Sequence, residues 1–76
     1  MFNATILTPE RILFQGDAWS IFLPGDTGEF EILDLHKPIT SLLKEGNIIV
    51  DWKKEIPIRA GAVKMVANQL VAIVEE

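Results

Sequence analysis

Short apolar runs ending in turn-forming residues recur roughly every eight to twelve residues along the chain, the rhythm of an all-β sandwich or barrel. Each strand of such a fold needs a reversal before the next, and proline, glycine, asparagine or neighbouring charges supply it. The breaks fall at residues 8–10, 15–17, 24–28, 45–47, 53–54, 61 and 68–69. We therefore predict an all-β fold, a small sandwich of about eight to ten short, mainly antiparallel strands.

Alternating side chains support this prediction and indicate which strand faces are covered. Trp19, Ile21 and Leu23 are spaced two apart, so they share one strand face, and we predict a core position for Trp19. The final run, residues 70–74, is almost wholly apolar, as expected of a strand covered on both faces. Pro57 cannot donate a ladder hydrogen bond, which predicts a bulged strand or one at a sheet edge.

Two local signals concern a helix and a turn. Ile39, Leu42 and Leu43 follow a helical spacing, so residues 38–45 are the best helix candidate, although the segment is short and contains β-branched residues. Pro24 and Gly25 predict the centre of a type II turn, because proline presets φ at the first central position and glycine tolerates positive φ at the second.

The length of 76 residues predicts one domain, residues 1–76. A domain of this size buries only about 60% of the surface that its unfolded chain exposes, which suggests that a partner helps to hold the fold. The chain has no cysteine and a single histidine, which excludes disulfides, thiolate metal sites and multi-histidine metal sites.

The formal net charge of −4 disfavours binding to nucleic acid or to anionic membrane surfaces, since both require basic patches. No apolar run approaches the roughly 20 residues that span a bilayer, and the first residues lack the basic and apolar regions of a signal peptide. We therefore expect a cytosolic or peripheral chain without direct membrane insertion.

The single histidine raises the question of catalysis. His36 and Asp34 are close enough in sequence to form an acid–base pair, but no serine or cysteine nucleophile motif accompanies them. A metal site built from Glu29, Glu31, Asp34 and His36 fits no standard spacing. The segment from Pro24 to Gly28 lacks the lysine and following helix of a phosphate-binding loop. We predict no catalytic residue, no metal and no cofactor.

Several motifs, taken in their order along the chain, resemble the sequence pattern of one known family. They are Ile6-Leu7-Thr8-Pro9-Glu10, Phe14-x-Gly16, Leu23-Pro24-Gly25-x-x-Gly28-Glu29-Phe30, Ile32-Leu33-x-x-His36-x-Pro38, Leu43-x-x-Gly46 and Ala60-Gly61-Ala62-Val63. With the final apolar strand, they cover essentially the whole chain. The sequence resembles the epsilon subunit of F-type ATP synthases.

The resemblance implies an N-terminal β-sandwich in a non-catalytic subunit of the rotating central stalk, at the cytoplasmic face of a bacterial membrane. It implies two partners, the gamma subunit and the c-ring of the membrane sector, and so a role in coupling ion flow to ATP synthesis. The residues implied for the c-ring interface, with Glu31 added from its place on the same strand face, are Asp26, Thr27, Gly28, Glu29 and Glu31. The residues implied for the gamma interface are His36, Pro38, Thr40 and Leu43.

The chain departs from the family pattern at several positions. Glu31 stands where the family usually has glycine, Asp34-Leu35 stand where it usually has proline-glycine, and Ala60 replaces the first glycine of a pair. The family usually continues into a C-terminal helical hairpin, which inhibits ATP hydrolysis and in some members binds ATP. Those regulatory roles are not transferred to residues 1–76.

Other function classes remain open from the sequence. One is a free-standing β-sandwich adaptor, and another is a small ligand-binding barrel or a hydrolase that uses His36. A stalk subunit should expose an apolar patch larger than a monomer normally tolerates, whereas scattered apolar residues would count against this role.

Overall fold

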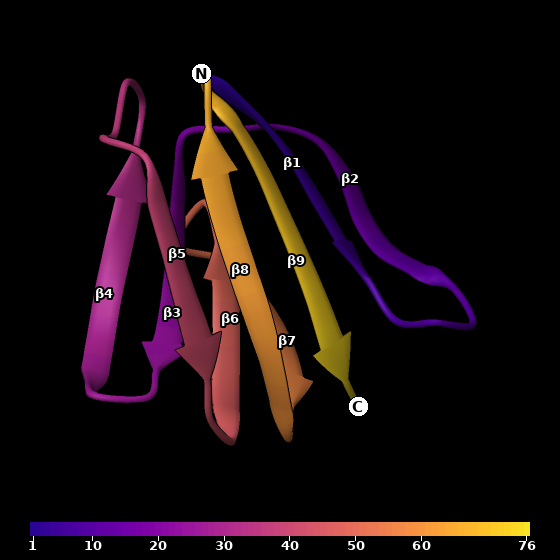
Figure 1. Cartoon of the computed structure of the whole chain (residues 1–76). Coiled ribbons are helices and arrows are strands. Elements are labelled where there is room, and N and C mark those ends of the chain that lie inside the picture. The colour runs from indigo at the N-terminus through magenta and orange to yellow at the C-terminus, as the bar shows by residue number, and fades with distance from the viewer.

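The computed structural model describes residues 1–76, which form nine strands and no helix (Figure 1). No segment of it is therefore a helix that could cross a membrane. The all-β prediction, with eight to ten strands, is confirmed. The strands are β1 (Phe2–Leu7), β2 (Ile12–Ala18), β3 (Ser20–Gly25), β4 (Gly28–Leu33), β5 (Ile39–Leu43), β6 (Gly46–Val50), β7 (Lys54–Ile58), β8 (Ala60–Val66) and β9 (Gln69–Glu75).

The strands are hydrogen-bonded in the order β2-β1-β9-β8-β5-β3-β6-β7, and β4 pairs with β3. Every pairing is antiparallel except that of β1 with β9, which brings the two ends of the chain together in parallel. The sheet folds back on itself, so that β8 lies in front of β6 and β7 in Figure 1. Pro57 lies on β7, the last strand in the order, which confirms the predicted edge position.

One core of 17 buried side chains fills the space between the two layers. It arises from strict alternation, which is clearest in β9, where every second residue is buried. Burying one large apolar side chain contributes about 1.5–3 kcal/mol, so these residues carry most of the stability of a small domain. The largest of them are Phe2, Ile6, Ile21, Leu23, Ile32, Ile48, Met65, Leu70 and Val63.

The helix candidate at residues 38–45 is wrong, because Ile39–Leu43 forms strand β5 and pairs residue by residue with β8. The strand places consecutive leucines on opposite faces: Leu42 is 65% exposed, and Leu43 is 5% exposed in the core. A continuous ladder with β8 satisfies the backbone, and this outweighs a helical spacing of only three apolar residues.

Two predictions of burial are also wrong. Trp19 is 57% exposed, because it lies at a bend between β2 and β3 and so does not share the alternation of β3. Strand β9 is not covered on both faces, since Val71 and Ile73 point to solvent. An apolar run alone therefore did not reveal that one face of this strand is open.

The predicted turn at Pro24-Gly25 is wrong as well, because both residues belong to β3 and Gly25 pairs with Gly28. The chain reverses at residues 26–27 instead. Gly25 lacks a positive φ. A Cβ there would lie 2.6 Å from the Gly28 carbonyl oxygen and 2.7 Å from the Phe30 ring. Close packing, and not turn geometry, requires this glycine.

Candidate protein-interaction surfaces

The hairpin between β3 and β4 presents most of the residues predicted to face the c-ring. Asp26, Thr27, Gly28 and Glu29 are all exposed at or beside the turn. The turn is fixed to the neighbouring strand, because the backbone N–H of Asp26 donates to the carbonyl oxygen of Leu42 at 3.0 Å. The hairpin turn is therefore tied to β5 at one end of β4.

The two glutamates of β4 differ in their surroundings. Glu31 is half-buried, and its carboxylate accepts a hydrogen bond from the buried hydroxyl of Ser20. The carboxylate of Glu29 is exposed and has neither a hydrogen bond nor an ion pair within the chain. Glu29 is thus free to bind an external donor, whereas Glu31 is already used internally.

The loop of residues 34–38 lies at the opposite end of β4 from the hairpin (Figure 1). His36 is half-buried there, while Pro38 and Thr40 are exposed. The Nδ1 atom of His36 lies 2.7 Å from the carbonyl oxygen of Lys37. A carbonyl oxygen only accepts, so Nδ1 is the donor in this contact and Nε2 is left for an external partner.

The loop contains no acid–base pair. The carboxylate of Asp34 is engaged by Asn68 and by the amino group of Met1, while the His36 ring contacts Lys37. The candidate metal ligands of this segment also fail to converge, since no group of three potential ligand side chains comes together in the structure.

Asn68 connects this loop to the β8–β9 turn and to the start of the chain. Its Oδ1 accepts from the N–H of Leu35 at 2.9 Å, and its Nδ2 donates to Oδ1 of Asp34 at 2.9 Å and to the carbonyl oxygen of Met1 at 3.1 Å. The hydrogen bond from Asn68, supported by the Met1 amino group 3.4 Å away, lowers the pKa of Asp34.

An exposed apolar row crosses five adjacent strands, and the sequence analysis did not identify it. Leu42 of β5 pairs with Ala62 of β8, Ala62 pairs with Ile73 of β9, Ile73 with Leu7 of β1, and Leu7 with Ile12 of β2. Paired residues point to the same face of a sheet, so these side chains form a continuous stripe. We call it the apolar row. Only the strand order could reveal it, because its members are far apart in the sequence.

The next row on the same face carries one charge. It runs through Thr40, Lys64, Val71, Thr5 and Gln15, which pair in turn across the same five strands. Lys64 is the only charged residue in the two rows, although the whole chain has a net charge of −4. These two rows therefore lack the acidic character of the chain as a whole.

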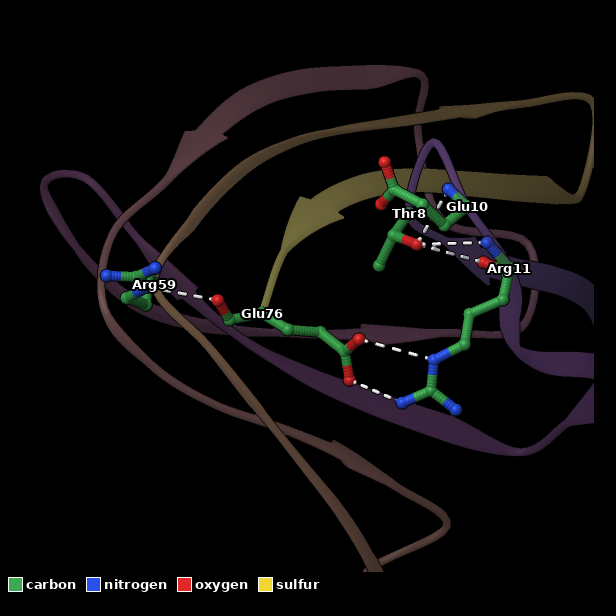
Figure 2. Close-up of polar contacts among 5 residues, drawn as sticks. All are labelled: Thr8, Glu10, Arg11, Arg59 and Glu76. Carbon is green, nitrogen blue, oxygen red and sulfur yellow. Dashed lines mark hydrogen bonds and ion pairs between the residues drawn. The ribbon is translucent and has the colours of Figure 1, made fainter.

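A hollow of about 540 Å³ lies beside the middle of the apolar row, where Ile73, Pro9 and Gly61 contribute to its lining. Figure 2 shows the polar contacts beside it. The Arg11 guanidinium forms a two-point ion pair with the Glu76 carboxylate, at 2.7 and 3.3 Å, and Arg59 donates to the Glu76 carbonyl oxygen at 3.0 Å. These contacts fix the end of β9 against the β1–β2 turn.

Comparisons with known proteins agree with the fold. Residues 1–76 match the family described as the ATP synthase delta/epsilon chain β-sandwich domain. The ATP synthase epsilon chain of Nitratiruptor sp. is 47% identical over 74 residues, covering 92% of this chain and 57% of that relative. The epsilon chain of Sulfurimonas denitrificans is 34% identical over 76 residues, with the same shares covered.

A solved structure shows the same fold at low sequence identity. A chain from the Tetrahymena thermophila mitochondrial ATP synthase central stalk and c-ring superposes with a TM-score of 0.83 at 17% identity, over 97% of this chain and 63% of that chain. The present chain spans 57% of the length of the two epsilon-chain relatives. The chain belongs to the ATP synthase delta/epsilon family, and residues 1–76 form its β-sandwich domain.

Proposed function

We propose that this chain is a non-catalytic central-stalk subunit of a rotary F-type ATP synthase, which binds the gamma subunit and the c-ring and so couples ion flow to ATP synthesis. In this role it lies peripherally at the cytoplasmic face of the membrane. The proposal rests on the family and on one structural observation, the apolar row.

The apolar row supports a large protein partner because it is continuous and mostly exposed. Ile73, at 55% exposure, lies near its centre, and Leu42, Leu7 and Ile12 extend it in both directions. A row of this kind gains from being covered, since each square ångström of apolar surface removed from water contributes about 25 cal/mol. Gamma is the proposed occupant. Acidic side chains on gamma would meet Lys64, the one charge in the two rows.

The proposed gamma surface continues from the apolar row to His36, Pro38 and Thr40. Thr40 stands in the row next to Leu42, on the same strand face. Leu43, which the sequence analysis also assigned to this interface, lies in the core, so the outward position belongs to Leu42. Leu43 then supports the surface from below.

The β3–β4 hairpin is the proposed contact with the polar loops of the c-ring, through Asp26, Thr27, Gly28 and Glu29. Its turn, which is tied to β5, and the unpartnered Glu29 carboxylate favour a polar, electrostatic contact. Glu31 lies beside this contact and takes part less directly, because Ser20 already satisfies its carboxylate.

Co-purification from the native cell tests the proposal. A tagged chain should retain gamma and c subunits, and Ile73→Lys should release gamma while leaving the chain folded, because Ile73 is exposed. Trp52→Lys is the matched control, since it places the same charge at an exposed apolar position outside the two rows. If the wild-type chain retains other proteins but neither of these subunits, it is a free-standing adaptor, and the proposal is wrong.

A further inference from the structure

Leu35 is the most exposed large apolar residue of the chain, with 81% of its surface accessible. It also has a φ of 61°, in the left-handed region that bulky side chains rarely occupy. A residue held in this conformation costs stability unless the surroundings fix it, and such residues concentrate at functional sites. Trp52 shares both features, with 61% exposure and a φ of 60°, but of the two only Leu35 also has its amide N–H bound by a side chain from a distant turn.

Two sets of contacts fix the backbone at Leu35: the His36 N–H donates to the Leu33 carbonyl oxygen at 3.2 Å, which closes the turn, and Asn68 binds the loop from the β8–β9 turn. The amide N–H of Leu35 donates to Oδ1 of Asn68, and the other end of the same amide group donates to Asp34. Asn68 itself has a φ of 60°, a conformation that asparagine tolerates better than most residues. The β8–β9 turn thus holds a loop that is 33 residues away in the sequence.

We propose that Leu35 is a preorganised contact residue that inserts into an apolar recess on the gamma subunit, and that Asn68 is its positioning residue. The proposal rests on the proposed function, because Leu35 adjoins His36 in the loop assigned to gamma. Fixing the loop before binding removes an entropic cost that a mobile leucine would pay on association.

Binding of purified gamma to four forms of the chain tests this proposal: wild type, Leu35→Gly, Asn68→Gly and the double variant. Glycine at position 35 adopts positive φ without strain, so Leu35→Gly should keep or raise the melting temperature. The same variant should weaken binding about tenfold, as expected for the loss of one interface residue that matters. Stability and binding then move in different directions, which a purely structural leucine does not predict.

Asn68→Gly should weaken binding several-fold and speed hydrogen exchange at the Leu35 amide, because that N–H loses its acceptor. The double variant should bind no worse than Leu35→Gly alone, since Asn68 acts through Leu35. Trp52→Gly is the matched control: Trp52 is also exposed, has a φ of 60° and lies in the β6–β7 turn. It should leave gamma binding unchanged.

Equal binding by wild type and Leu35→Gly overturns the role of Leu35. Additive losses in the double variant overturn the positioning role of Asn68. If the wild-type chain itself fails to bind gamma, the proposed function falls, and this outcome differs from the first two.

Discussion

The β3–β4 hairpin and the 34–36 loop lie at opposite ends of β4, yet different forces hold them (Figure 1). The hairpin is held by close packing of Gly25 under the Phe30 ring and by backbone hydrogen bonds to the segment around β5. The loop has one backbone hydrogen bond of its own, from His36 to Leu33, and its contacts to the rest of the molecule are polar ones from the Asn68 side chain and the Met1 amino group. A packed hairpin tolerates almost no change, whereas a loop attached through a few polar contacts can be released by a single substitution.

The largest expected effect on stability is in the β3–β4 hairpin, which close packing holds. Gly25→Ala should lower the free energy of unfolding by about 1–3 kcal/mol, since the added methyl group overlaps the Gly28 carbonyl oxygen and the Phe30 ring. Urea denaturation measures the loss. Adding Phe30→Leu to this variant should recover part of it, because the smaller side chain relieves one overlap. Unchanged stability of Gly25→Ala would show that the hairpin is not held by packing.

Substitutions that release the 34–36 loop should cost less stability. Asn68→Ala removes three hydrogen bonds at the surface and places alanine at positive φ, so we expect a loss of about 1–2 kcal/mol. Asn47→Ala is the control, because Asn47 makes one exposed side-chain hydrogen bond, to Glu55, and its loss should stay within about 0.5 kcal/mol. Equal losses in thermal denaturation would contradict a special role for Asn68.

The hydrogen bond between Asn68 and Asp34 also predicts that the stability of the fold depends on pH. The pKa of Asp34 is lowered from its ordinary value of 3.8, so on acidification the unfolded chain takes up this proton before the folded chain. The stabilisation that the ionised Asp34 carboxylate gives to the folded chain is fully present at a pH above 3.8. It is lost as the pH falls through the lower pKa of the folded state. Comparing wild type with Asp34→Asn by urea denaturation between pH 5 and pH 2.5 should give a shallower fall for the variant. If the unfolding free energies of the two forms fall in parallel with pH, the contacts of Asp34 are not a source of acid sensitivity.

The smallest effect is expected at the ion pair of Arg11 and Glu76, which lies on the surface (Figure 2). Glu76→Gln should cost less than about 1 kcal/mol, because exposed ion pairs gain little over hydration. The difference from wild type should shrink further at high salt, since screening weakens the attraction. A large loss that salt does not change would mean that the end of β9 is held more tightly than the loop at the other end.

The strand pattern was predictable because alternation and turn residues act locally. Ile21, Val63 and Met65 are buried, as the alternation along their strands indicates, and the final apolar run is a strand. The failures at Trp19 and Pro24-Gly25 also have a local cause: a bend or a close contact changed which residues the pattern applies to.

The candidate surfaces were predictable only in part. The resemblance indicated the exposed hairpin and the His36 loop, and the structure places most of those residues at the surface. It could not indicate that Leu42 and not Leu43 faces outward, since that depends on β5 being a strand. The apolar row and the Asn68 contacts join residues from distant segments, and no local pattern contains them.

The sequence by itself determined the class of fold and the family, because these depend on composition, spacing and ordered motifs. The tertiary structure decided which apolar residues remain uncovered and which loop is held in place. Both depend on strand order and register, which bring Leu42 beside Ala62 and Ile73, and Leu35 beside Asn68. Side chains that meet across a sheet are set by the pairing of the backbone, and that pairing is a property of the whole fold.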